Sequence, residues 1–329
     1  MPQIVRFHET GGPEVLKIEN IEITPPGPDE VLFDVKAIGL NRAECMFRSG
    51  HYLSTPQFPS RIGYEASGIV RAVGSSVKEF VPGDVVSVVP HSDLSKYGVY
   101  GQIATVPAYF VVKHPSNLSF NEAAATWMQY LTAYGALIDI AQIQKGDFVV
   151  IPAASSSVGL AAIQLVNLIG AIPIATTRTN TKRKALMDAG AAFVIATQEE
   201  DLPAKINEFT KGKGARVVFD PVGGKTVSNL AKGMAHGGIL FQYGGLSAEP
   251  TPFPTMLALS KGLTMRGYTL FELVSDSNRF ENAKKFVYEA LSTGKIKPII
   301  AKTFPLNEIV AAHRYMESNE QFGKIIVTT

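Results

Sequence analysis

The amino-acid sequence predicts an α/β protein made of two parts, one mostly β and one built on a parallel sheet. Residues 1 to about 120 consist of short strand-like runs separated by turn-forming residues. Further along, short and fully apolar runs alternate with helical segments, which is typical of a parallel sheet covered by helices on both faces. A chain of 329 residues with 46% hydrophobic residues can bury a core in each of two domains.

The strand signal of the first part lies in the runs Val31–Val35, Gly68–Val70 and Asp84–Val89. Segments rich in proline and glycine, such as Pro25–Pro28 and Pro82–Asp84, interrupt these runs. The pattern predicts an irregular β domain.

The second part begins near Asn121, where a helix start predicts an apolar-rich helix to about Ile140. The strands expected after it are Phe148–Ile151, Ile172–Ala175, Phe193–Ile195, Arg216–Phe219 and Ile239–Phe241. The helices expected between them start at about Val158 and cover Lys182–Ala189, Leu202–Thr210 and Thr226–Met234. After about Gly267, a helix near Arg279–Leu291 and a final strand, Lys324–Val327, are expected to return to the first domain.

Composition argues against nucleic-acid or membrane partners. The net charge is only +2, and the longest basic run is Lys182–Lys184. The most apolar stretch, Val158–Thr177, is broken by Gly170 and Pro173, so we expect no membrane span. Met1–Arg6 lacks the pattern of a signal peptide, and one cysteine, Cys45, cannot form an internal disulfide. We therefore expect a cytoplasmic protein.

The segment Val149–Gln164 is the most informative, because it joins a buried strand to a helix through a turn of small residues. Small residues allow the backbone to approach a pyrophosphate, and a helix N-terminus provides N–H donors for that anion. The predicted contacts are Ser155, Ser156, Ser157, Val158 and Gly159. An ordinary strand-to-helix loop with a capping serine is the alternative, but this turn opens a βαβαβ series, as a Rossmann-type dinucleotide site requires.

The end of the second strand predicts which dinucleotide binds. An NAD site places an acidic residue there, whereas Ala175–Arg183 contains no carboxylate. Arg178 and Lys182 are available for the 2′-phosphate of NADPH, with Thr177 beside them, although both cations are also compatible with a solvated helix face. We therefore predict NADPH as the cofactor.

With these motifs in place, the chain resembles the zinc-independent, quinone oxidoreductase-like branch of the medium-chain dehydrogenase/reductase superfamily. The segments that carry the resemblance span nearly the whole chain: Gly11–Leu16, Gly39–Glu44, Gly63–Gly68, Val81–Val86, Leu131–Tyr134, Phe219–Gly224 and Gly323–Val327.

The resemblance implies a GroES-like, mostly β catalytic domain, residues 1–122 and 267–329, and a Rossmann NADP(H)-binding domain, residues 123–266. It also implies a cofactor in the cleft between domains and a homodimer, with a tetramer as the alternative.

The resemblance further implies the site residues. On the substrate side these are Asn41 and Tyr52, as donors to the oxygen on which negative charge develops during hydride transfer. The expected additional cofactor contacts are Asn41, Thr132, Val222, Gly223, Tyr243, Gly244, Gly245, Leu270, Phe271 and Lys324. The alternative for Asn41 is a residue that holds a turn, and the site role is favoured over it; for Tyr52 a position on the barrel surface fits equally well. Met46 stands where quinone-reducing relatives often carry a tyrosine, which leaves a more apolar pocket wall.

No metal site is expected. Catalytic zinc takes three ligands from Cys, His and carboxylates, and zinc-using relatives place a cysteine and a histidine where this chain has Asn41 and Tyr64. The predicted function is NADPH-dependent reduction of a quinone or an α,β-unsaturated carbonyl. The alternatives are an enoyl-thioester reductase of the same family and a non-catalytic, crystallin-like NADPH-binding protein.

Overall fold

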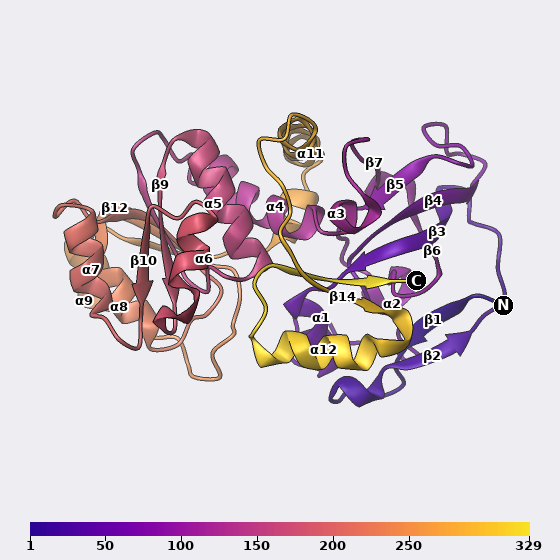
Figure 1. The fold of residues 1–329 in the computed structure, drawn as a ribbon, viewed down its shortest axis with the longest axis horizontal. Coiled ribbons are helices and arrows are strands. Elements are labelled where there is room, and N and C mark those ends of the chain that lie inside the picture. The colour runs from indigo at the N-terminus through magenta and orange to yellow at the C-terminus, as the bar shows by residue number, and fades with distance from the viewer. The chain divides into compact units, whose positions relative to one another are not determined.

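The computed structural model describes residues 1–329, which form two compact units (Figure 1). Unit 1 contains Met1–Met128 and Lys297–Thr329, and unit 2 contains Gln129–Ile296. These divisions differ from the expected boundaries after residues 122 and 266, most of all at the second one. The helix α11 (Ser277–Ser292) belongs to unit 2, where Arg279 Nη2 lies 2.6 Å from Asp139 Oδ2.

Unit 2 contains a six-stranded, fully parallel sheet with the order β10-β9-β8-β11-β12-β13. Its strands are β8 (Phe148–Ile151), β9 (Ile172–Thr177), β10 (Phe193–Ala196), β11 (Ala215–Asp220), β12 (Met234–Gln242) and β13 (Thr264–Gly267). Numbered along the unit, this is the order 3-2-1-4-5-6 of a Rossmann fold, which confirms the predicted fold class. The chain reverses its direction of winding between β8 and β11.

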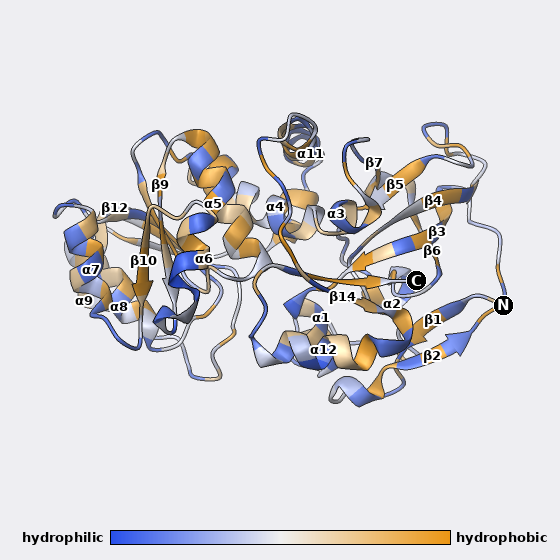
Figure 2. Ribbon diagram, in the orientation of Figure 1, coloured by the Kyte–Doolittle hydropathy of each residue, from blue (hydrophilic) through white to orange (hydrophobic).

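Helices cover both faces of this sheet, with α5 and α6 on one side and α7, α8 and α9 on the other (Figure 1). The helices of unit 2 are α5 (Ser157–Ile169), α6 (Arg183–Asp188), α7 (Leu202–Phe209), α8 (Thr226–Lys232), α9 (Thr255–Lys261), α10 (Leu270–Val274) and α11. Figure 2 shows that β10 is hydrophobic and that α7 mixes hydrophobic and hydrophilic residues. The apolar side chains of β8, β9 and β11, such as Val150, Ile174 and Val218, form the core.

The helix expected from Asn121 to Ile140 is three segments. The helix α3 (Phe120–Ala124) ends before α4 (Trp127–Tyr134), which continues into a π-helical turn, Gly135–Ile140. The break after α3 follows the Ala125 backbone, which leaves the helical conformation at φ −99° and ψ 22°.

Unit 1 contains a largely antiparallel sheet with the order β14-β15-β3-β4-β5-β7, and β6 also pairs with β3. The strands of this sheet are β3 (Glu30–Gly39), β4 (Glu65–Val73), β5 (Val85–Val88), β6 (Ile103–Pro107), β7 (Val111–Lys113), β14 (Ile300–Pro305) and β15 (Lys324–Thr328). A separate two-stranded sheet is formed by β1 (Gln3–Arg6) and β2 (Lys17–Asn20). The remaining helices of unit 1 are α1 (Arg42–Arg48), α2 (Leu94–Tyr97) and α12 (Ile309–Ser318). The last strand pairs with β3, so the chain end returns to the first domain as expected.

Among all helices there is none whose length and apolar content would allow it to span a lipid bilayer.

Candidate active site

The phosphate loop of unit 2 has the geometry of a helix that begins directly after a buried strand. Ser156 is the N-cap of α5, with extended backbone at φ −69° and ψ 161°. Its Oγ accepts the Gly159 N–H at 3.1 Å, and its carbonyl accepts the Leu160 N–H. The N–H groups of Ser157 and Val158 have no carbonyl one turn earlier in the helix. They lie at the positive end of the helix dipole, where such groups can donate to an anion, and their role toward a cofactor stays a prediction.

Gly159 is required for the close approach of this helix to the loop. A Cβ at this position would lie 2.7 Å from the Cα and the carbonyl oxygen of Ala154. Because these are backbone atoms, a larger residue would displace the loop that precedes α5. This is the packing that the third glycine of a dinucleotide fingerprint provides.

The end of β9 brings one predicted cation directly to the phosphate loop. Lys182 Nζ donates to Ser155 Oγ at 3.3 Å. Arg178 is exposed at the same edge, whereas Arg183 is paired with Glu200 and also donates to the Val194 carbonyl. The β9 end itself contains no carboxylate, but Glu199, after β10, accepts the Asn180 N–H at 3.1 Å.

The ends of β11 and β12 bring the other predicted loop residues to the same edge of the sheet. Buried Asp220 accepts the N–H groups of Val222 and Gly223 at 2.8 and 3.0 Å. Burial raises its pKa. Tyr243 stacks on Phe219, with ring centroids 4.0 Å apart.

Gly244 lies against the loop after β11, since a Cβ there would be 2.8 Å from the Pro221 carbonyl oxygen, whereas Gly245 faces open space. Thr132 lies in α4, Leu270 opens α10, and Phe271 is half-buried beside it. The roles of these residues toward a cofactor stay predictions.

In unit 1, Asn41 lies at the start of α1 and is only 6% exposed. Its Nδ2 lies 3.1 Å from the Gly39 carbonyl oxygen, 3.3 Å from Glu65 Oε1 and 3.4 Å from Glu44 Oε1. Its Oδ1 accepts from Lys324 Nζ at 2.7 Å. The side chain therefore joins β3, β4 and β15.

Lys324 is fully buried and forms an ion pair with Glu65, which is also fully buried. The second Glu65 oxygen accepts the Met128 N–H at 3.0 Å. Gly39 leaves the space for this pair, because a Cβ there would lie 2.8 Å from Lys324 Cε and 2.0 Å from the Ala124 carbonyl oxygen. The Lys324 ammonium, predicted to reach a phosphate, is held inside unit 1 by Asn41 and Glu65.

Glu44 is a functional candidate that sequence reasoning missed. Its carboxylate accepts the Asn41 N–H at 2.6 Å, the Tyr64 N–H at 2.8 Å and the Tyr100 hydroxyl at 2.5 Å. Burial raises its pKa to about 7, although these bonds and the charge of Lys324 oppose the rise. The spacing Asn41-x-x-Glu44 matches a capping box and was a usable signal.

Tyr100 extends this cluster to α12. Arg48 Nη1 lies 2.8 Å from His313 Nδ1 and can only donate, so the His313 proton is on Nε2, 3.3 Å from Tyr100 Oη. Burial, with the nearby charge of Arg48, lowers the pKa of His313 to about 3. No sequence spacing connects these residues, since His313 is 213 positions from Tyr100.

Tyr52 and Tyr64 form a hydrogen-bonded pair beside Glu44. The hydrogen bond between the two hydroxyls raises the pKa of Tyr64 and opposes the rise at Tyr52. Burial is the larger effect and raises the pKa of Tyr52. Tyr52 thus keeps its proton and can donate a hydrogen bond, but it is a weaker acid than a free tyrosine. No three His, Cys, Asp or Glu side chains come together as a metal-binding group.

Comparison with known proteins gives matches over both units. Residues 27–116 match the family "Alcohol dehydrogenase GroES-like domain", and residues 157–289 match the family "Zinc-binding dehydrogenase". Among curated relatives, Quinone oxidoreductase 1 of Escherichia coli (strain K12) is 33% identical over 98% of both chains. The 2-haloacrylate reductase of a Burkholderia species is 29% identical, over 98% of this chain and 97% of that protein.

Solved structures give the same result. Escherichia coli quinone oxidoreductase complexed with NADPH has a TM-score of 0.91 at 30% identity, covering 99% of this chain and 100% of that chain. The CurK enoyl reductase has a TM-score of 0.88 at 26% identity, covering 99% of each chain. The chain therefore belongs to the medium-chain dehydrogenase/reductase superfamily, as a quinone oxidoreductase-like protein with a nucleotide-binding oxidoreductase fold.

Proposed function

We propose that this protein is an NADPH-dependent, zinc-independent oxidoreductase that reduces a quinone or an α,β-unsaturated carbonyl. The contact between Lys182 and Ser155 carries this proposal, because it places a cation where the phosphate loop meets the end of β9. Two relatives point to such acceptors by name, quinone oxidoreductase and 2-haloacrylate reductase.

The residues present fit NADPH. Ser156, Ser157, Val158 and Gly159 would hold the pyrophosphate at the start of α5, and Gly159 leaves the space that a Cβ would fill. Lys182 and exposed Arg178 would hold the 2′-phosphate, beside Thr177. When bound, the reduced nicotinamide supplies the hydride, and the protein supplies orientation and electrostatics.

On the substrate side, the Tyr52 hydroxyl donates to the oxygen that gains negative charge. The raised pKa of Tyr52 makes it a hydrogen-bond donor, and the proton that completes the reduction comes from solvent. Asn41 shares the two hydrogens of its amide among three acceptors, and the 3.4 Å contact with Glu44 is the one that a ligand oxygen would replace. Lys324 holds Asn41 in place through Oδ1.

Zinc independence is supported by what surrounds Glu65. Its carboxylate is paired with Lys324, a cation supplied by the chain itself. Dialysis against a chelator should leave quinone reduction unchanged, whereas a loss of activity that zinc restores would contradict this part of the proposal.

The decisive experiment compares both nucleotides in wild type and in two single variants, Arg178→Ala and Lys182→Ala. Each variant should weaken NADPH binding roughly 10- to 100-fold and change NADH binding little, since each loses one charge-assisted contact to phosphate. The control Lys184→Ala removes an exposed cation of α6 that pairs with Asp188. Equal affinities of wild type for NADH and NADPH would refute the assigned roles.

The acceptor is identified by adding 1,4-benzoquinone, an enone or an enoyl thioester to enzyme and NADPH. Preference for the thioester would favour the enoyl reductase alternative, which the similarity to CurK enoyl reductase supports. Binding of NADPH without oxidation by any acceptor would instead indicate a non-catalytic binding protein.

We also propose a cytoplasmic homodimer. Three large apolar side chains on and beside α9 are strongly exposed: Phe253 at 61%, Met256 at 77% and Leu259 at 74%. The helix α9 directly precedes β13 in the chain, and β13 is an edge strand of the parallel sheet. Light scattering should give twice the mass of 35.4 kDa. A Met256→Glu variant should weaken the dimer, and a monomeric wild type would contradict it.

A further inference from the structure

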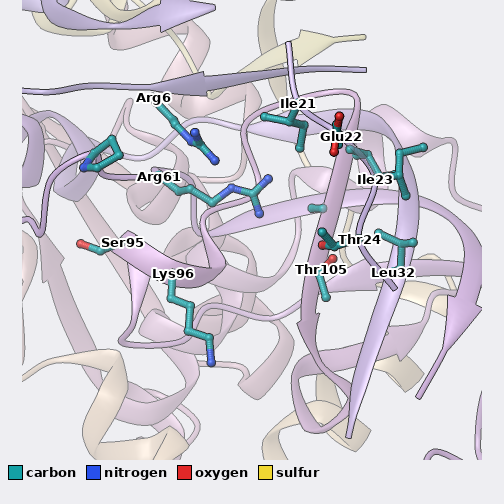
Figure 3. Close-up of a pocket in the computed structure, with 13 residues that line it drawn as sticks. Arg6, Ile21, Glu22, Ile23, Thr24, Leu32, Arg61, Ser95, Lys96 and Thr105 are labelled. Carbon is teal, nitrogen blue, oxygen red and sulfur yellow. The ribbon is translucent and has the colours of Figure 1, made fainter. Parts of the chain in front are cut away.

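A second pocket lies in unit 1 and shares no residue with the candidate active site. It has a volume of about 360 Å³ and is formed by the segment after β2, the loop before Ile62, the helix α2 and the strand β6 (Figure 3). This volume is within the range of pockets that bind small molecules. Nothing in the proposed reduction uses it.

The guanidinium of Arg61 is the unusual feature of this pocket. No carboxylate acts on it, whereas the most buried cations of unit 1, Arg48 and Lys324, are paired with Glu317 and Glu65. Burial and the like charge of Arg6 lower the pKa of Arg61 to about 10. Arg61 is half-buried, so its guanidinium is partly removed from water, and a cation in this position that lines a pocket without a counter-ion indicates a site for an anion.

The two guanidinium groups converge on one space. Figure 3 shows the Arg6 side chain extending from β1 to the side of the pocket where the Arg61 side chain, from the loop, runs toward Thr24 and Thr105, while Lys96 extends away from them. Arg6 forms an ion pair with Glu19, with 3.5 Å between Nη1 and the carboxylate oxygen. Two neighbouring guanidinium groups repel each other unless an anion lies between them, and the planar fork of arginine suits a carboxylate or a phosphate.

The opposite wall of the pocket combines apolar side chains with the threonines Thr24 and Thr105. Leu32 and Ile103, 5% and 3% exposed, pack with Ile21 into one cluster that lines this wall. An inorganic ion would leave this wall without a partner. We propose that the pocket binds a small organic anion, a carboxylate or phosphate monoester joined to a compact apolar group. The one acidic residue of the lining is Glu22, and its negative charge lowers the affinity of the pocket for anions.

Calorimetry on the full chain tests the proposal, with phenylacetate, phenyl phosphate and neutral phenylacetamide at constant ionic strength in a buffer free of other organic anions. We expect saturable 1:1 binding of at least one of the two anions and none of the amide, and comparing the anions identifies the preferred headgroup. Arg61→Met should weaken binding at least ~10-fold, and Glu22→Gln should strengthen it. The control Arg71→Met removes an exposed arginine paired with Asp34 and should not change binding. Absence of binding to both anions, or equal affinity of Arg61→Met, would overturn the proposal.

Thermal unfolding without ligand gives an independent test. If the Arg61 charge lacks a partner, Arg61→Met should raise Tm and abolish the Tm increase that the anion causes. A lower Tm without ligand would show that the protein itself stabilises this charge and would refute the inference. If Arg61→Met does not fold, Arg6→Gln must weaken anion binding at least several-fold. Quinone reduction by these variants should match that of wild type. The anion-binding proposal can therefore be refuted without refuting the proposed reductase activity, and the reverse also holds.

Discussion

Two regions position their polar groups in opposite ways. One is the phosphate loop of unit 2, Ser155–Gly159, and the other is the buried cluster of unit 1, formed by Asn41, Glu44, Glu65 and Lys324. In the loop the defining bond is local, from Gly159 N–H to Ser156 Oγ three residues earlier. In the cluster the defining bonds are distant, since Lys324 reaches Glu65 and Asn41 across 259 and 283 positions. The loop leaves backbone N–H groups available to a ligand, whereas the donors of the cluster, such as the Lys324 ammonium, are hydrogen-bonded within the protein.

This difference predicts whether a substitution mainly weakens ligand binding or mainly lowers stability. A change in the loop removes a shape that a ligand uses, so binding should suffer more than folding. A change in the cluster leaves a buried charge without a partner, so folding should suffer first.

The largest effect should follow Lys324→Met, which leaves the Glu65 carboxylate buried and unpaired. We expect a loss of about 3–5 kcal/mol in the free energy of unfolding, measured with urea. The control Lys225→Met breaks the pair with Glu249, whose side chains are 83% and 51% exposed, and should cost at most about 1 kcal/mol. Similar losses for both variants would mean that burial does not distinguish the two pairs.

The next effect concerns pH. The pKa of Glu44 rises from 4.5 to about 7 on folding, so the folded state binds more protons in that window and stability falls as pH rises. Glu44→Gln removes this fall, and its free energy of unfolding should gain about 3 kcal/mol on wild type between pH 4.5 and pH 7.

His313 acts with the opposite sign and sharpens this test. Its pKa falls from 6.5 to about 3 on folding, so the unfolded state binds more protons between these values and stability rises with pH. His313→Gln should therefore lose stability relative to wild type as pH increases through this window. Parallel pH profiles for wild type and both variants would show that neither group titrates as its burial requires.

The local and distant contacts also explain how far the sequence could be interpreted. The strand-to-helix turn at Ser156 and the alternation of strands and helices in unit 2 follow from short-range patterns, and both were predicted, whereas the sixth strand, β13, was not. The capping spacing of Asn41 and Glu44 was present in the sequence, but it identifies a helix start and not a buried carboxylate with a raised pKa. The contacts of Tyr100 with His313 depend on packing of α12, which no spacing encodes.

The division of the chain into two units differs from the expected one for a related reason. The helix near Arg279–Leu291 was expected to return to the first domain with the final strand, whereas the Arg279 pair with Asp139 joins α11 to unit 2. An ion pair across 140 positions has no local signal.

A smaller effect is expected from a substitution that changes the shape of the phosphate loop without changing its charge. Gly159→Ala places a Cβ 2.7 Å from Ala154 backbone atoms, so the start of α5 must shift. NADPH affinity should fall about 10-fold or more, equal to roughly 1.4 kcal/mol, in a fluorescence titration. Gly267→Ala is the control, because a Cβ there meets nothing within 4 Å. Unchanged affinity in Gly159→Ala would mean that the close helix approach is not needed for binding.

The smallest effect is expected at Cys45, which lies in the cluster but takes no part in its charge balance. Burial raises the pKa of its thiol to about 12, and only 3% of the residue is exposed. Since the thiolate is the reactive form, the native protein should not react with a disulfide reagent at pH 8, whereas urea-unfolded protein should release one equivalent. Cys45→Ala should leave kcat and KM unchanged. Rapid labelling of the native protein would show that α1 and α12 separate readily, and the cluster would then be a mobile part of the molecule and the loop its rigid counterpart.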